Sequence, residues 1–116
     1  MTASTIDLLQ GTLDVLVLKA LSWGPRHGHA VARIIRDSTA GTLLVLDGSL
    51  YAALHRLEER RLVEGHWGLS DKGKRAKFYA LTPTGRKQLR TEAAVWERYA
   101  ASVSRLLSAR AEPARS

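Results

Sequence analysis

The sequence predicts a mainly α-helical fold with one small β-hairpin. Apolar residues recur at helical spacing in four separate segments, and late in the chain two short apolar or aromatic segments flank a polar loop. A third observation is the length of the last helical segment, which exceeds what a small domain can cover. With 116 residues, the chain is long enough for one domain, or for one domain with a long helix attached.

Composition narrows the class of partner. The formal net charge of +7 favours polyanions, meaning nucleic acid or an anionic membrane surface. The absence of cysteine excludes disulfides, thiol redox chemistry and thiolate metal sites. No apolar segment reaches the length of a membrane span, and the polar start lacks the features of a signal peptide. We therefore expect a soluble, cytoplasmic protein.

The first helix is expected from Ile6 to Trp23. Its apolar residues, Leu9 and Leu13 among them, lie on several sides of the helix and not on one face alone. Such a helix is usually covered by more than one neighbour, here the domain core and a second subunit. Gly11 falls inside the expected helix, at a cost of about 1 kcal/mol in helix propensity.

A turn and a short second helix follow. Residues 24–28 contain strong helix breakers and predict the turn, and His29 to Ser38 have the spacing of a helix. Thr39 to Leu46 form either a connector or a minor strand. His27 and His29 resemble a ligand pair, but no cysteine or tight carboxylate cluster accompanies them, so we expect no metal site.

The segment from Gly48 to Arg61 predicts an amphipathic helix of about three turns. Asp47 is the expected N-cap. Small and polar side chains come first on its outer face and bases follow, which suits a recognition helix in a DNA major groove. The alternative is the solvated face of an ordinary surface helix. The apolar face holds Leu50, Ala53, Leu54 and Leu57, and the candidate DNA-binding residues are Ser49, Tyr51, Ala52, His55 and Arg56.

Two strands are expected next, from Leu62 to Trp67 and from Lys77 to Thr82. The loop between them, Gly68 to Ala76, holds two glycines and several bases. A basic hairpin tip can straddle a sugar–phosphate backbone or enter a minor groove, because phosphate contacts need charge and reach. The alternative is a merely soluble loop. The candidate backbone-contacting bases are Lys72, Lys74, Arg75 and Lys77.

A long last helix is predicted from Pro83 to about Ala109, with Thr82 as its N-cap and Pro83 at the first helical position. Its apolar residues alternate in steps of four and three, the repeat of a helix that packs along a partner helix. Because the helix would span roughly 40 Å, we expect its stripe to pair with a second chain. With Leu9 and Leu13, the stripe forms the candidate interface for a dimer or an effector: Leu89, Ala93, Trp96, Ala100, Val103 and Leu107.

The order of helix, helix, recognition helix and two-stranded wing predicts a winged helix-turn-helix. We expect this DNA-binding domain over residues 1–82, a dimerisation helix over 83–110 and a frayed tail over 111–116. No nucleophile–base order, phosphate-binding glycine loop or paired carboxylate site stands out, so we predict no enzyme activity and no cofactor. The alternative function is a winged-helix protein–protein module whose basic wing meets an acidic partner.

The chain resembles the PadR family of bacterial transcriptional regulators. The likeness runs through Leu9 to Asp14, Leu18 to Leu21, Gly24 to Gly28, Gly48 to Glu58 and Tyr79 to Gly85, and it covers most of residues 8 to 90. The chain departs from the family at Ala52, where Pro is frequent, and at His29, where an aromatic residue is frequent. Ala52 should matter little because Ala is the better helix former, whereas His29 could alter local packing.

The resemblance implies a homodimer that binds a palindromic operator, usually represses transcription and often releases DNA when a small hydrophobic effector binds. It also implies that Ser49 and Tyr51 contact DNA and that Lys72, Lys74 and Arg75 hold the backbone. The end of the chain resembles the branch of the family with a single C-terminal helix. In some of its members a Trp on this helix lines an effector pore at the dimer interface. Trp96 has a matching place, and its alternative role is an anchor of the dimer seam.

Overall fold

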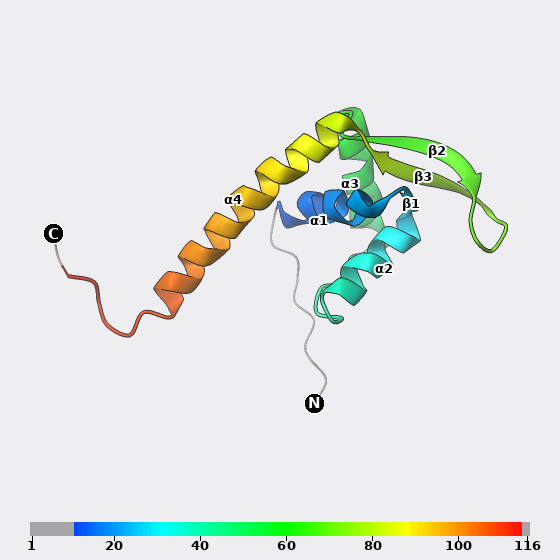
Figure 1. Ribbon diagram of the computed structural model, residues 1–116. Coiled ribbons are helices and arrows are strands. Elements are labelled where there is room, and N and C mark those ends of the chain that lie inside the picture. Colours follow the sequence, from blue (N-terminus) through cyan, green and yellow to red (C-terminus); the bar gives the residue numbers. More distant parts are fainter. Residues whose placement is uncertain (1–10, 115–116) are drawn as a thin grey trace.

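A computed structural model describes residues 11–114 of the chain (Figure 1). These residues form four α-helices and one three-stranded sheet, which confirms the predicted fold class. In chain order the elements are α1 (Thr12–Ala20), a 3-10 turn η1 (Leu21–Trp23), β1 (Arg26–His27), α2 (Gly28–Ser38), α3 (Asp47–Glu59), β2 (Val63–Leu69), β3 (Arg75–Leu81) and α4 (Pro83–Leu107).

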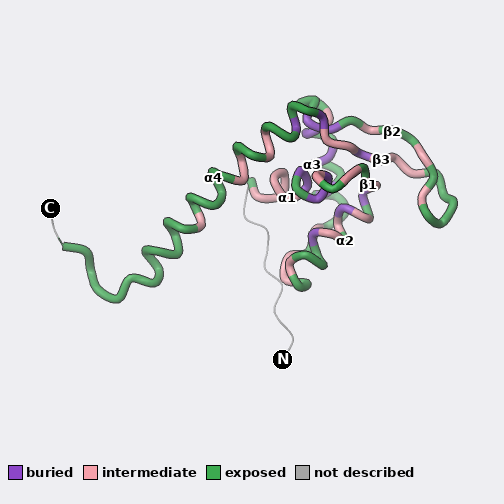
Figure 2. Tube along the Cα trace, in the orientation of Figure 1, coloured by how far each residue is buried: buried purple, intermediate pink, exposed green. Residues whose placement is uncertain are grey.

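One hydrophobic core holds the first three helices and the base of the sheet together. Each of these elements turns an apolar face inward, as the helical spacing of their leucines and valines requires. Burial is concentrated there, while α4 is mostly exposed along its distal length (Figure 2). The largest fully buried side chains are those of Leu18, Leu21, Leu50, Leu54, Leu57, Val17, Val31 and Val63.

The first helix is shorter than expected. Its α-helical part begins at Thr12, and Leu21–Trp23 continue it as a 3-10 turn. Gly11 lies just before the helix and not inside it, with φ 84°, a left-handed conformation that Gly adopts without steric penalty. Ile6, Leu8 and Leu9 lie outside the described residues. The expectation of a continuous helix through Gly11 was therefore wrong.

The helix α3 confirms the predicted amphipathic segment but not its cap. Leu46 is the N-cap, no side chain makes a cap hydrogen bond, and Asp47 is already the first helical residue. The carboxylate of Asp47 still lies in the first turn, where the helix dipole favours negative charge. The helix ends at Glu59, and Arg61 adopts a left-handed φ of 60° in the turn that leads to β2.

The sheet has one strand more than the sequence predicted. Arg26–His27 lie in the segment expected to be a turn, and they pair antiparallel with β3, so the strand order is β1-β3-β2. β2 and β3 form the predicted hairpin but are longer than expected, pairing from Val63 with Leu81 to Leu69 with Arg75. The tip is consequently shorter, running from residue 70 to residue 74. A two-residue strand carries no periodicity that the sequence could reveal.

The start of α4 is as the sequence predicted. Thr82 caps the helix, its Oγ1 accepting a hydrogen bond from the backbone N–H of Gly85 at 2.9 Å, and Pro83 occupies the first turn. The Thr82 hydroxyl also donates to the carbonyl of Arg61 at 2.8 Å. Gly85 packs directly on the Leu62 carbonyl, where any Cβ would collide with backbone. These contacts fix α4 to the turn between α3 and β2.

Candidate nucleic-acid interface

The outer face of α3 carries the predicted recognition residues. Ser49, Ala52 and His55 are exposed, whereas the four apolar residues of the helix are buried in the core. This division follows from the helical period, because residues three and four apart share a face. The small side chains at positions 49 and 52 allow a close approach of the helix to a surface.

Tyr51 lies at the flank of that face, against the start of α2. Its side chain is 45% exposed, and its ring packs over Gly28, where a Cβ would lie 2.7 Å from the phenol oxygen. Gly28 is therefore required for this packing, because any larger residue would displace the ring. The contact holds the Tyr51 hydroxyl at the junction of α2 and α3 while leaving part of the ring in solvent.

Arg56 has a partner inside the chain. Its Nη2 lies 2.8 Å from Asp14 Oδ1 of α1, and the arginine side chain remains about half exposed. The pair ties α3 to α1. Arg56 thus differs from the other predicted contact residues of α3, since part of its hydrogen-bonding capacity is already used.

The wing tip presents the predicted bases in solvent. Lys72, Lys74 and Arg75 are exposed, and the turn that carries them is closed by hydrogen bonds between Ser70 and Lys74, with Gly73 at φ 75°. Arg75 stacks its guanidinium 4.8 Å from the ring centroid of Trp67 on the neighbouring strand. This cation–π contact restricts the arginine without neutralising its charge.

Lys77 occupies a different environment from the bases at the tip. Its Nζ lies 3.0 Å from Glu58 Oε1, and this hydrogen bond is the main cause that raises the pKa of Lys77. The ammonium also lies 5.4 Å from the ring centroid of Tyr79, whose own pKa is raised by burial. The structure therefore places Lys77 along β3, opposite Trp67, where it joins the wing to the end of α3.

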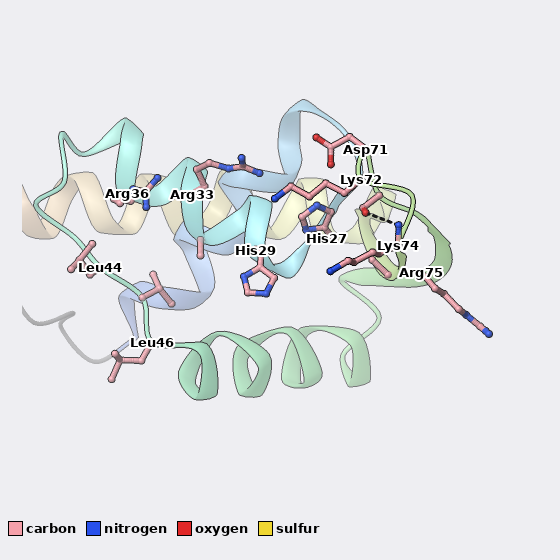
Figure 3. A pocket seen from close by; sticks show the side chains of 14 residues that line it. His27, His29, Arg33, Arg36, Leu44, Leu46, Asp71, Lys72, Lys74 and Arg75 are labelled. Atoms are coloured by element: carbon pink, nitrogen blue, oxygen red, sulfur yellow. Dashed lines mark hydrogen bonds between the residues drawn. The ribbon is translucent and has the colours of Figure 1, made fainter.

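A basic cleft of about 830 Å³ lies between α2 and the wing tip (Figure 3). The connector that leads into α3, Leu44 to Leu46, forms its third wall. Figure 3 shows the Lys72 side chain extending from the wing tip toward α2. The bases of α2 in this cleft are absent from the predicted site, although their outward positions on the second helix were evident from helical spacing. The lining bases are Arg33, Arg36, Lys72, Lys74 and Arg75.

His27 is explained by a structural role. Its Nδ1 accepts the backbone N–H of Ala30 at 3.3 Å and so caps α2. Its ring also packs edge-on to Phe78 with centroids 5.5 Å apart. Within residues 11–114 no three His, Cys, Asp or Glu side chains gather in a way that could hold a metal ion.

The candidate dimer or effector face lies on α4, away from the wing (Figure 1). Leu13 and Leu89 pack against the core, Ala93 and Ala100 are half-buried, and Leu9 lies outside the described residues. Further along the helix the apolar side chains are open to solvent. Of the predicted stripe these are Trp96, Val103 and Leu107, and a second row that the sequence reading missed adds Val95, Tyr99 and Leu106.

A hollow of about 690 Å³ lies where α4 crosses the start of α1. Trp96 lines it together with Val15 and Tyr99, and the Trp96 and Tyr99 ring centroids are 5.8 Å apart. Trp96 remains 38% exposed. The spacing of Val95 and Tyr99, four residues apart beside Trp96, is the signal by which the second row could have been found.

No helix within residues 11–114 is long and apolar enough to cross a membrane.

Three helices, a recognition helix in the third position and a two-stranded wing together define a winged helix-turn-helix protein. The wing and the outer face of α3 carry exposed bases and small polar side chains.

Comparison with known proteins identifies the family. Residues 17–91 match the model of the "Transcriptional regulator PadR-like family", which is more than half of the chain. An uncharacterised protein X of Lysinibacillus sphaericus is 32% identical over 84 residues, which span 72% of this chain and 76% of that protein. The chain therefore belongs to the PadR-like family of transcriptional regulators, and the expected absence of enzyme activity agrees with this membership.

Two further proteins are similar to this chain, and the match covers very different shares of their length. The crystal structure of a PadR-like transcriptional regulator from Bacillus cereus superposes with a TM-score of 0.74 at 27% identity, covering 87% of this chain and 96% of that one. An uncharacterised 37.1 kDa protein in a transposon of Streptomyces fradiae is 44% identical over 80 residues. That match covers 69% of this chain but only 21% of the transposon protein.

Proposed function

We propose that the chain binds duplex DNA as a homodimer, at a palindromic operator, and represses transcription from it. The observation that carries the proposal is the arrangement of its exposed charge. The helix α2, the connector that leads into α3 and the wing tip border one cleft, in which five bases face a single carboxylate, that of Asp71. The phosphates of DNA supply the complementary charge, and the neutralisation of phosphates provides most of the affinity of such surfaces.

Specific recognition is assigned to α3. Ser49, Tyr51, Ala52 and His55 lie on or beside its exposed face and reach toward base edges in the major groove. Lys72, Lys74 and Arg75 contact the backbone from the wing, where position carries little sequence information. Arg56 and Lys77 contribute mainly through their ion pairs with Asp14 and Glu58.

The contact with a second copy of the chain is assigned to α4. The helix has 25 residues and a length of about 37 Å at 1.5 Å per residue. Val103 and Leu107 lie beyond the hollow where α4 crosses the start of α1, and Trp96 lies at its edge, and all three side chains are exposed. Two such helices packed together would cover both stripes and place the two recognition helices on successive half-sites of a palindrome.

Selection of binding sites from random duplex DNA tests the DNA-binding proposal. We expect enrichment of an inverted repeat, and an observed affinity that falls log-linearly with salt through counterion release. A winged-helix module for an acidic protein partner would give no enrichment, and all duplexes would compete equally. Enrichment of a single half-site without a repeat would contradict the palindromic operator.

The effector proposal concerns Trp96. A planar aromatic ligand in the hollow beside α1 would stack on this ring and quench its fluorescence. Trp96→Ala should abolish that quenching while leaving operator affinity nearly intact, provided that the dimer persists. If aromatic ligands do not bind the wild-type protein, Trp96 is an anchor of the dimer seam and the effector proposal is wrong.

A further inference from the structure

The cleft beside α2 extends the candidate DNA surface beyond the recognition helix and the wing. It begins at Leu46, the residue before α3, runs along the outer face of α2 and ends at the wing tip between Ser70 and Ala76. The cleft therefore lies between the wing tip, to which backbone contacts have been assigned, and the connector that leads into α3. Figure 3 shows the side chain of His29, from α2, between Leu46 and the lysines of the wing tip, so a backbone strand that ran from the connector to the wing would pass over α2.

The chemistry of the cleft suits an extended polyanion. All five of its bases are exposed, so their charges are hydrated and meet an anion without burial. A small anion gains little from hydrated, flexible bases, because each weak contact must also offset the loss of side-chain freedom. A strand with regularly spaced phosphates meets several bases at once and releases their counterions together.

The side chains of α2 differ in whether they already have an ion-pair or hydrogen-bond partner within residues 11–114. Arg36 pairs with its neighbour Asp37 at 3.1 Å, an exposed pair that contributes little to stability. Arg33 makes no salt bridge or hydrogen bond through its side chain to any of residues 11–114. The ring of His27 accepts the Ala30 N–H through Nδ1, so in the neutral form its remaining proton is on Nε2, which is then a donor.

The connector contributes a complementary apolar wall. Leu44 and Leu46 both line the cleft, and they are 49% and 75% exposed. Deoxyribose presents carbon-bound hydrogens between successive phosphates, so leucines beside a row of bases match the alternation of sugar and phosphate along a strand. A cleft for phosphate alone would gain nothing from these two leucines.

We infer that the cleft between α2 and the wing tip holds one sugar–phosphate strand of the DNA, with Arg33 as the principal phosphate contact from α2. The inference rests on the proposed function and adds to it an element outside both α3 and the wing. Arg33 and Lys72 hold the strand from opposite sides, and the exposed His29 ring lies beside it. Leu44 and Leu46 contact its sugars.

Arg33→Ala tests this assignment, with Arg98→Ala as the matched control. Both variants lose one exposed arginine from a helix, but Arg98 lies on α4, away from the cleft. DNA affinity is measured by fluorescence anisotropy across a salt series, on a mixed-sequence duplex and on the selected site. Loss of one charged contact should weaken binding to both duplexes by about tenfold and reduce the magnitude of the salt slope by about 1.

Arg33→Lys should restore most of the affinity, because a phosphate contact needs charge more than a planar donor fork. Circular dichroism and thermal unfolding check that Arg33→Ala leaves the fold intact. The inference is overturned if Arg33→Ala binds both duplexes as Arg98→Ala does while the wild-type protein binds DNA normally. It is also overturned if Arg33→Ala loses binding of inorganic pyrophosphate but keeps its DNA affinity. Failure of the wild-type protein to bind any duplex would instead overturn the proposed function.

Discussion

The wing tip and the distal half of α4 both expose large parts of their surface, but charged side chains predominate at the tip and apolar side chains on the helix. At the wing tip the exposed side chains include three bases and Asp71, while Trp67 and Leu69 are exposed on the strand behind it. The core and the Glu58–Lys77 pair hold the hairpin in place. On α4 beyond Ala93 they include two rows of apolar and aromatic side chains. The hairpin tip is well hydrated as it stands, whereas the α4 surface is costly to leave in water.

This difference in exposed side chains predicts a different kind of partner for the wing and for α4. Hydrated bases bind a polyanion with little desolvation, so the wing can bind and release DNA with affinity set by salt. An apolar helical stripe gains by being covered, and a second copy of the same stripe covers it symmetrically. The two regions should therefore fail in different ways when they are altered, one in DNA affinity and the other in assembly.

The largest effect is expected at Val103. Val103→Glu would place a charge in the α4 seam, where no partner is available to neutralise it, and should weaken dimer association by roughly a hundredfold. Ala101→Glu is the control, because residue 101 is exposed and lies off both apolar rows. Light scattering at micromolar concentration measures the outcome. A Val103→Glu protein as dimeric as wild type would place the seam elsewhere.

At the wing, replacement of Lys74 and Arg75 by Ala should reduce DNA affinity by roughly thirtyfold and the salt slope by about 2, since two phosphate contacts are lost. Because backbone contacts carry little sequence information, selected and mixed-sequence duplexes should weaken alike. The dimer should persist, in contrast to Val103→Glu. A loss confined to the selected site would mean that the wing reads bases.

Tyr51 connects the recognition helix to α2, and its effect should be smaller. Tyr51→Phe keeps the ring over Gly28 and removes only the hydroxyl, so operator binding should lose about 1 kcal/mol. Tyr51→Ala also removes the packing and should lose more. Anisotropy on the selected duplex compares the two variants. Operator binding by Tyr51→Ala that equals wild type would show that the recognition surface lies elsewhere.

Periodicity explains how much of this fold could be read from the sequence. The face of α3, the Thr82 cap and the wing hairpin follow from local patterns, and each is present in the structure. β1 could not be predicted, because Arg26–His27 become a strand only by pairing with β3. The prediction that Asp47 is the N-cap of α3 was wrong, because Leu46 occupies the N-cap position in the folded chain.

The candidate site was predictable only where contacts are local. The bases of the wing tip could be predicted because they lie together in the sequence. The partners Asp14 for Arg56 and Glu58 for Lys77 lie far away in the chain, and sequence spacing gives no sign of them. The cleft was missed for the same reason, since Arg33 and Lys72 meet only through the tertiary fold.

The smallest effect is expected at Lys77, in the ion pair between the wing and α3. Lys77→Met should lower the free energy of unfolding by at most about 1 kcal/mol, because its pair with Glu58 is partly exposed. The raised pKa of Lys77 means that this stabilisation is fully present at neutral pH and is lost as pH rises through that pKa, above 10.5. Urea unfolding at neutral pH and above pH 10.5 measures it. A difference between Lys77→Met and wild type that does not shrink at the higher pH would contradict the ion pair.

Tyr79 titrates in the same alkaline range, because burial raises its pKa above 10.0. A double-mutant cycle with Glu58→Gln separates the pair from this background. The coupling between Lys77 and Glu58 should be favourable at neutral pH and vanish at the higher pH. Altered DNA affinity in Lys77→Met, with stability unchanged, would instead make Lys77 a backbone contact like the bases of the tip.

The mass of the complex with a selected duplex tests the central contrast most directly, because it depends on both regions at once. Light scattering on the purified complex should give two chains bound to one duplex, with Val103→Glu shifting the protein toward single chains and the Lys74 and Arg75 replacement releasing free dimer. One chain per duplex from the wild-type protein, or a dimer that binds no duplex, would contradict a division of the molecule into a DNA-binding domain and a dimerising helix.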